Sequence, residues 1–398
     1  MSLYALLPES IGGIKLCLAF LCSFIITYLS IPIIVRISVE KNLFALPNRR
    51  TSHQHATPTL GGIAMFASVL ITSLLFVNSN EAHTFQYVIA GSFILFFFGL
   101  KDDLIPLSWK KKIFGEALAA FFLIILGDFR ITDLQGIMGI YQINYISSVI
   151  ITFIVMIGIV NAMNLIDGID GLAAGLSFMA TCVFGVWFFL IGQSALAVIS
   201  ISITGMLLAY LRFNVFGTTN KIFMGDTGSL LLGYMMTVFV IVMNRQSIAL
   251  ESPWYINNAP IVSFGILFIP LFDTLRVMGI RMMKGKSPFT ADRNHIHHRI
   301  LRLGFTHLQT TLILMFINGC FILLVFSLQN LDVHMLMLLI FSLGIIKSLI
   351  PSYIGRLWQA RALRVMLADR NKSKVGPRAV HYKEVRLKVK PLSWVHNN

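Results

Sequence analysis

Carboxylate and amide side chains stand at the ends of several apolar runs in this chain. Asp102 and Asp103 follow one run, and Asp226 opens another. A third run ends in four polar residues at three-residue spacing: Asn161, Asn164, Asp167 and Asp170. Oxygen ligands of these kinds suit Mg²⁺, which usually binds through one or two carboxylates together with substrate phosphate. The pattern therefore predicts a site for metal-assisted chemistry on a phosphate.

Each of these segments also has a purely structural interpretation. The Asp102–Asp103 pair, followed by Lys110–Lys112, fits a solvated loop, and the spaced Asn and Asp residues fit a polar seam between helices. Gly168 and Gly171 instead favour a helix end whose backbone opens around a ligand. Asp226 lies in a sequence typical of a helix N-terminus, where it could act only as an N-cap. An N-cap needs no other carboxylates nearby, so a shared ligand site is the favoured interpretation.

A basic segment carries a second group of candidates. His295, His297 and His298 lie between Arg293 and Arg299, in an extended loop predicted over residues 281–307. No cysteine is close in the sequence, so the pattern does not favour a Cys/His zinc site. Imidazole and guanidinium donors suit phosphate oxygens. Such donors beside carboxylates and Mg²⁺ are typical of phosphoryl transfer.

The composition places these residues in a membrane protein. Of 398 residues, 56% are hydrophobic and 12% are charged, with a mean hydropathy of +0.79. Soluble proteins are nearer about 25% charged. The net charge is +15, but the basic residues lie between apolar runs, which indicates the lipid bilayer rather than nucleic acid as the partner.

Eleven apolar stretches approach the length of about 20 residues that spans a bilayer. They cover residues 11–36, 60–77, 84–100, 112–127, 143–163, 172–191, 194–211, 227–244, 259–280, 308–328 and 333–350. With the N-terminus outside, 28 of the 32 Lys and Arg residues fall in inner segments, as the positive-inside rule requires. We therefore predict an all-α polytopic membrane protein of about eleven transmembrane helices with a cytoplasmic C-terminus.

In this topology residues 1–350 form a single transmembrane catalytic domain, and residues 351–398 form a basic cytoplasmic tail. The aspartates gather at the inner face, where Asp273 and Asp292 join them. Ionisable residues at membrane depth are costly and indicate function. Asp273, which follows Pro270, is interpreted either as a ligand or as support for the site. Residues 128–144 alternate polar and apolar types and predict a small outer hairpin.

The polar segments resemble the motifs of the polyprenyl-phosphate N-acetylhexosamine-1-phosphate transferases, glycosyltransferase family 4. The segments that carry the resemblance, in family order, are Pro47–Arg50 with Thr57–Gly62, Asp102–Asp103, Asn161–Ala173, Phe223–Ser229, and Ser287–Phe289 with Asp292–His298. They cover roughly residues 40 to 305. Any one motif alone is only moderately specific, whereas the whole set is highly specific.

This resemblance implies transfer of a sugar-1-phosphate from a UDP-N-acetylhexosamine to undecaprenyl phosphate, with release of UMP. Ile296 interrupts the histidine run, which is similar to the GlcNAc-1-phosphate transferases that initiate cell-surface polysaccharides such as O-antigen. The muramoyl-pentapeptide transferases tend to carry three adjacent histidines, which argues against that branch. UDP-MurNAc-pentapeptide or another UDP-N-acetylhexosamine is the alternative donor. The implied location is a bacterial inner membrane with the active site facing the cytoplasm, and the resemblance also allows a homodimer.

The resemblance further implies residue roles. Asn164 and Asp226 would bind Mg²⁺, for which Mn²⁺ could substitute. Asp102 and Asp103 would activate or position the lipid phosphate, with Asp102 the better general base, and Lys112 would reach the phosphates. A lipid phosphate is already largely ionised near neutral pH, however, so positioning and charge neutralisation are expected to matter more than proton removal.

The remaining implied contacts are with the donor. The nucleotide would be bound by Gly168, Ile169, Asp170 and Phe223. The pyrophosphate and sugar would be bound by Asn161, Asp167, His295, His297, His298 and Arg299.

Two other classes of protein compete with an enzyme. A secondary transporter would also have many spans and intramembrane carboxylates, but transporters usually show internal repeats and midplane sites. No such repeat is visible, and the polar residues gather at one face. A non-catalytic scaffold or receptor would need no aspartate-rich inner cluster.

Overall fold

The computed structural model describes residues 12–45, 57–245, 250–287 and 294–373. In this part of the chain almost every element is a helix, which confirms the predicted all-α polytopic class. The contacts divide the chain into a unit from Met1 to Pro351 and a second unit from Ser352 to Asn398. The elements discussed below belong to the first unit, except that the last helix continues into the second.

The helices follow the apolar runs, because a backbone in lipid must satisfy its own hydrogen bonds. Their bounds are α1 Gly12–Glu40, α2 Gly61–Phe76, α3 Ser79–Leu104, α4 Trp109–Ala120, α5 Tyr145–Ile166, α6 Leu172–Leu190, α7 Ser194–Asn214, α8 Gly225–Arg245, α9 Ala259–Ile266, α10 Phe268–Met283, α11 Ile296–Leu301, α12 His307–Ser327 and α13 Val333–Ser373. A π-helical turn, Phe121–Leu126, continues α4. The two short strands, β1 Phe44–Ala45 and β2 Thr57–Pro58, pair antiparallel.

Each of the eleven predicted spans falls on a helix or a helix pair of the structure. By length and composition alone, seven described helices can cross a membrane, or eight if the bent pair α9–α10 is counted as one span. Helix α2 is apolar but has only 16 residues. The total of eleven and the sides on which the termini lie therefore stay predictions.

The predicted span over residues 259–280 is not one straight helix, because the chain bends by 92° between α9 and α10. Pro270 has no N–H and therefore cannot bond to the carbonyl of Ile266. Asn318 of α12 supplies the missing partners: its Nδ2 donates to Ile266 O at 3.0 Å, and its Oδ1 accepts from Ile269 N at 3.1 Å. A buried side chain from another helix thus stabilises the break.

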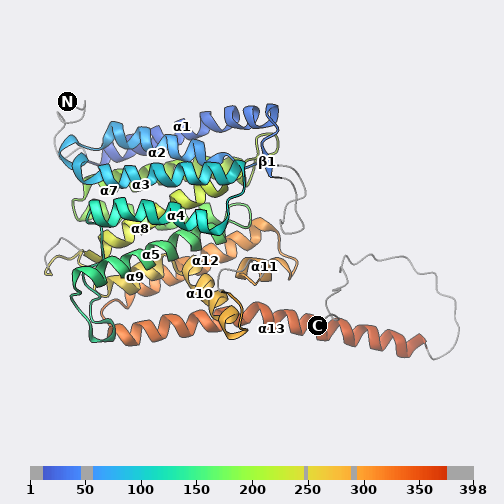
Figure 1. The fold of residues 1–398 in the computed structure, drawn as a ribbon. Coiled ribbons are helices and arrows are strands. Elements are labelled where there is room, and N and C mark those ends of the chain that lie inside the picture. The colour runs from blue at the N-terminus through green and yellow to red at the C-terminus, as the bar shows by residue number, and fades with distance from the viewer. Residues whose placement is uncertain (1–11, 46–56, 246–249, 288–293, 374–398) are drawn as a thin grey trace. The chain divides into compact units, whose positions relative to one another are not determined.

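Helix α8 forms the centre of the bundle (Figure 1), with 89% of its apolar window buried against 28% in α1. Two glycines let neighbouring helices approach its first turn. A Cβ on Gly62 of α2 would lie 2.4 Å from Gly228 N, and one on Gly99 of α3 would lie 2.5 Å from Thr227 Cα. The start of α8 is therefore enclosed by α2 and α3.

The segment before α8 is tied to the segment before α2. Phe223 N donates to Pro58 O at 2.8 Å, while Gly61 N and Gly62 N donate to Phe223 O and Met224 O, each at 2.9 Å. Two of the sequence motifs, far apart in the chain, are thus joined by backbone hydrogen bonds. Figure 1 shows β1 and α11 at this same end of the bundle.

The predicted hairpin over residues 128–144 is present. Asp133 and Gln142 form an antiparallel bridge, and Leu134 N donates to Tyr141 O at 2.9 Å. The loop is anchored to the bundle where Gln135 Oε1 accepts from Ala259 N at 2.6 Å. The hairpin therefore closes over the start of α9.

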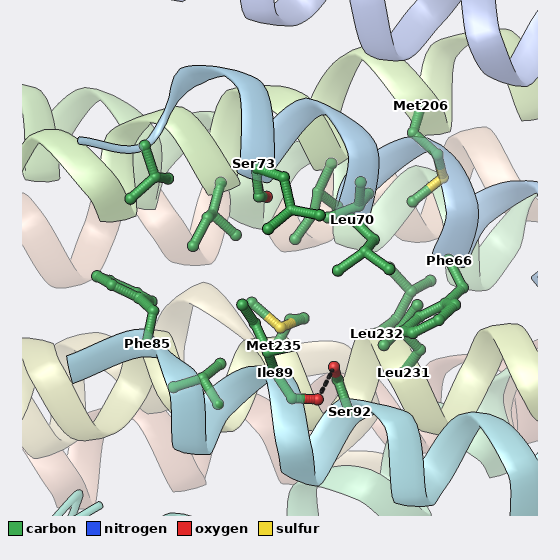
Figure 2. Close-up of a pocket in the computed structure, with 16 residues that line it drawn as sticks. Phe66, Leu70, Ser73, Phe85, Ile89, Ser92, Met206, Leu231, Leu232 and Met235 are labelled. Atoms are coloured by element: carbon green, nitrogen blue, oxygen red, sulfur yellow. Dashed lines mark hydrogen bonds between the residues drawn. The ribbon is translucent and has the colours of Figure 1, made fainter. Parts of the chain in front are cut away.

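An apolar cavity of about 250 Å³ lies between α2, α3, α7 and α8. Figure 2 shows side chains such as Leu70, Phe85 and Met235 pointing into it from three of these helices. The hydroxyl of Ser92 bonds to its own helix at Ile89 O, 2.7 Å away. None of the predicted site residues lines this cavity, so the polar chemistry lies elsewhere.

Candidate active site

A lysine ammonium joins two carboxylates where α3, α4 and α8 meet. Lys112 Nζ of α4 lies 2.5 Å from Asp102 Oδ2 at the end of α3 and 2.5 Å from Asp226 Oδ2 at the start of α8. Burial, together with the neighbouring Asp226 carboxylate, raises the pKa of Asp102 to about 6. Two acidic groups this close need a cation between them, and in the structure Lys112 supplies it.

Asn164, near the end of α5, completes this group. Its Nδ2 donates to Asp226 Oδ1 at 3.0 Å and to Ser229 Oγ at 2.9 Å. The structure thus brings together Asp102, Lys112, Asn164 and Asp226, as the sequence predicted. We call these four residues the acidic cluster.

Asp103 lies beside the cluster but has different contacts from Asp102. Its carboxylate accepts from Asp226 N at 2.7 Å, from Thr227 N at 3.0 Å and from Thr227 Oγ1 at 2.5 Å. Burial raises the pKa of Asp103 to about 7, and these hydrogen bonds act in the opposite direction. Asp103 of α3 therefore binds the free N–H groups at the start of α8. In the structural interpretation of the sequence, this capping role belonged to Asp226.

Glu116 is a partner that the sequence reasoning did not assign to the site. It is buried in α4 and accepts from Asn161 Nδ2 at 2.8 Å. Asn161 also donates to Ile157 O of its own helix at 2.9 Å. Glu116 lies inside the predicted span 112–127, and a carboxylate inside an apolar run is itself a signal of function.

The chain opens between α5 and α6, where the glycines predicted a helix end. Helix α5 ends at Ile166, and α6 begins after Gly171, whose φ of +76° suits glycine. Gly171 N donates to Asn214 Oδ1 at 2.6 Å, which anchors the turn to α7. We call residues 167–171 the turn segment.

Two aspartates of the turn segment have different surroundings. Asp167 is half-buried, and among the described residues its carboxylate accepts no hydrogen bond. Burial, with the charges of Asp226, Asp103 and Asp170, raises its pKa to about 8. Asp170 Oδ2 instead contacts two bases, Lys221 Nζ at 2.7 Å and His307 Nδ1 at 3.3 Å.

The predicted nucleotide residues fall on both sides of Lys221. Its Nζ bonds to Asp170 and also lies 5.9 Å from the centre of the half-buried Phe223 ring. Ile169 is buried, whereas Gly168 is not. The sequence reasoning did not single out Lys221, although a lysine two residues before Phe223 was a visible signal.

The three histidines lie on α11 and just before it. His295 and His297 are buried, whereas His298 and Arg299 are half-buried. A Cβ added to Gly168 would lie 2.5 Å from His297 Nε2, so His297 packs directly against the turn segment. Burial lowers the pKa of His297 to about 3, and its ring is therefore neutral rather than a cationic phosphate ligand.

Several predicted positions lie outside the described residues or have other contacts. Asp292, Phe289 and the segment Pro47–Arg50 fall outside the described ranges. Arg299 Nη1 donates to Ser348 O of α13 at 2.9 Å, so this side chain links α11 to the last helix.

The acidic cluster fits Mg²⁺ in the kind of donors that it offers. Asp102, Asp226 and Asn164 present carboxylate and amide groups, and the ammonium of Lys112 lies where these carboxylates meet. In the described ranges no three His, Cys, Asp or Glu side chains are placed to hold a metal ion. Mg²⁺ commonly needs only one or two carboxylates when a substrate phosphate supplies further oxygens.

A large apolar cavity reaches the cluster. It has a volume of about 820 Å³ and runs between α4, α5, α8, α9 and α10. Its lining is almost entirely apolar. Trp109, Lys112 and Asn161 line it where it meets the cluster, and Ile131 and Leu134 of the hairpin also line it. A long apolar molecule with a charged head matches this arrangement.

The fold and this site define a polytopic membrane protein with an acidic and amide-rich centre at one end of its bundle. A family model described as "Glycosyl transferase family 4" matches residues 85–244, which hold the whole acidic cluster but not α11. The chain is 30% identical over 277 residues to the undecaprenyl-phosphate alpha-N-acetylglucosaminyl 1-phosphate transferase of Yersinia pestis, covering 69% of this chain and 73% of that protein.

Other relatives carry the same name. The protein from Haemophilus influenzae is 32% identical, with 69% of this chain and 76% of that protein covered, and the one from Escherichia coli K12 is 30% identical, with 69% and 73% covered. The chain therefore belongs to glycosyl transferase family 4, as its motifs predicted.

Proposed function

We propose that the chain transfers N-acetylglucosamine-1-phosphate from UDP-N-acetylglucosamine to undecaprenyl phosphate, releasing UMP. The names of the relatives support this substrate pair. The observation that carries the proposal is the junction of the acidic cluster with the apolar cavity, because it offers one place for a charged phosphate and an apolar chain.

In this reaction an oxygen of the lipid phosphate attacks the phosphorus bonded to the sugar. The bond from that phosphorus to the bridging oxygen breaks, and UMP leaves with this oxygen. No net proton transfer is needed when the lipid phosphate enters ionised. Positioning and charge neutralisation are then the main contributions of the protein.

The residues of the cluster suit these contributions. Lys112 and Arg281 both line the apolar cavity, and Lys112 is the one that contacts the acidic cluster, so in this proposal Lys112 meets the lipid phosphate. Asp102 and Asp226 hold the ammonium of Lys112, and Asn164 orients Asp226. Asp103 fixes the start of α8 and thereby the position of Asp226.

We further propose Mg²⁺ as the cofactor, with Mn²⁺ as a substitute, held by Asp226 and Asn164. When bound, the ion would neutralise charge on the diphosphate. In this proposal the cluster faces the cytoplasm of a bacterial inner membrane. His298, Arg299 and the turn segment border the sugar-nucleotide side, and Phe223 offers a ring for the base.

The test is release of UMP by the purified chain. We expect lipid-linked product and UMP from UDP-GlcNAc and undecaprenyl phosphate with Mg²⁺, and loss of both with EDTA. Asp226→Asn should abolish turnover, whereas Asp332→Asn, in an exposed turn before α13, should leave it unchanged. UDP-GalNAc and UDP-MurNAc-pentapeptide complete the donor set. No UMP from any donor, with measurable solute flux in liposomes, would instead support a transporter.

A further inference from the structure

A buried carboxylate outside the acidic cluster organises the histidine segment. Asp273 of α10 is 1% exposed and accepts from His295 Nδ1 at 2.9 Å. Both of its oxygens also accept from Ile296 N, each at 3.1 Å. A buried carboxylate with several donors is held in one geometry, so Asp273 defines where α11 begins.

Arg276 ties this carboxylate to the other side of the same segment. Its Nη2 lies 2.7 Å from Asp273 Oδ1 and also donates to Asn294 O at 2.6 Å. The ion pair thus binds the backbone immediately before and immediately after His295. This arrangement also compensates the buried charges, since neither Asp273 nor Arg276 is left unpaired.

The contact with Asp273 decides which nitrogen of His295 carries the proton. A carboxylate only accepts, so Nδ1 of a neutral ring must hold the hydrogen and Nε2 must be bare. The ring is buried, and within the described ranges its Nε2 has no hydrogen-bond partner. His295 therefore makes its polar contact inward, toward α10.

The ring of His295 supports the histidine that reaches the turn segment. It lies nearly parallel to the ring of His297, with centroids 5.9 Å apart and 15° between planes. His297 in turn packs against Gly168, and the centroid of its ring lies 4.2 Å from the centroid of the His298 ring. A chain of contacts thus runs from Asp273 to the turn segment.

We propose that Asp273 and His295 are a positioning pair for the transfer reaction, which rests on the function proposed above. Asp273 holds Nδ1 of His295 and the first backbone N–H of α11, and His295 supports the ring of His297 against Gly168. Neither member of the pair touches the donor. The donor is met by the residues that they position, His297, His298 and the turn segment.

Two substitutions at one position separate positioning from direct contact. In His295→Asn the amide Nδ2 replaces the Nδ1 donor to Asp273 and nothing replaces Nε2. In His295→Gln the amide reaches the place of Nε2 and the Nδ1 donor is lost. We expect a donor KM within about threefold of the parent for His295→Asn and at least a tenfold rise for His295→Gln. The KM for undecaprenyl phosphate should stay within about twofold in both, a split that general destabilisation would not produce.

Asp273→Asn extends the test to the partner. It should raise the donor KM at least as much as His295→Gln does, because it also removes the ion pair with Arg276. The double variant of Asp273→Asn and His295→Gln should be no worse than Asp273→Asn alone, because the contact between the two side chains is already lost. The reverse order at position 295, with Asn impaired and Gln active, would show that Nε2 contacts the donor and would overturn the proposal. Additive effects in the double variant would overturn it as well.

A readout without turnover separates this proposal from the proposed function. In protein labelled with ¹⁵N-histidine, the signal that disappears in His295→Asn should show a hydrogen on Nδ1. A bare Nδ1 in the parent would refute the pair. If the parent released no UMP from any donor, the transferase function would fail, while the spectrum would still decide whether the pair exists.

Discussion

Replacing Gly168 by alanine would test whether the contact between the turn segment and α11 controls donor binding. The new Cβ would lie 2.5 Å from His297 Nε2, whereas ordinary contacts begin near 3.4 Å. The backbone itself accepts alanine, because Gly168 has no positive φ. The ring of His297 must therefore withdraw by about 0.9 Å, the difference between these two distances.

The size of the effect follows from the cost of crowding a packed site. One extra carbon in such a place costs about 1–3 kcal/mol. If His297 relieves the clash by leaving its donor-binding position, donor binding must restore that position at this cost. Since about 1.4 kcal/mol is a factor of ten, the donor KM should rise about 5- to 150-fold.

The assay is steady-state UMP release over a range of UDP-GlcNAc concentrations, at saturating undecaprenyl phosphate. Gly279→Ala is the matched control, because a Cβ on Gly279 of α10 meets nothing within 4 Å. It should leave both KM values unchanged. A donor KM for Gly168→Ala within about twofold of the parent would refute the idea that His297 and the turn segment form one donor-binding unit.

Three other predictions follow from particular residues. Burial and neighbouring charges raise the pKa of Asp167 to about 8, so this group is neutral at pH 7 and becomes charged above pH 8. The donor KM should therefore rise between pH 7.5 and about pH 9. Asp167→Asn should remove this rise, and a rise that persists would point to another group. Asn318→Leu leaves Ile266 O and Ile269 N without partners, at about 1–3 kcal/mol each, and should lower the Tm in detergent; an unchanged Tm would mean that other groups stabilise the break. A tag after residue 398 should resist protease added to intact cells, and its cleavage would reverse the predicted topology.

The helical fold was predictable because a long apolar run in a membrane has almost no alternative to a helix. The bend at residue 267 was not. Pro270 was visible in the sequence, but a proline can kink, break or start a helix. Asn318, nearly fifty residues later, supplies both missing hydrogen bonds and makes the sharp break stable.

The residues of the acidic cluster were also predictable, since aspartates and asparagines at membrane depth are costly and usually have a function. Glu116 and Lys221 carried comparable signals but were not assigned. Glu116 is defined as a site residue only by its hydrogen bond to Asn161, and Lys221 only by its contact with Asp170. The spacing of residues in the sequence shows neither hydrogen bond, because in each pair the two residues lie on different helices or loops.

By itself the sequence determined the residue types of the site, the apolar runs that become helices, and the family to which the chain belongs. Only the tertiary structure decided what each residue does. Asp102 and Asp103 are adjacent and chemically identical, yet one pairs with Lys112 and the other caps α8. The physical reason is that a carboxylate acts on groups about 3 Å away, and the packing of α3 against α4 and α8 selects those groups.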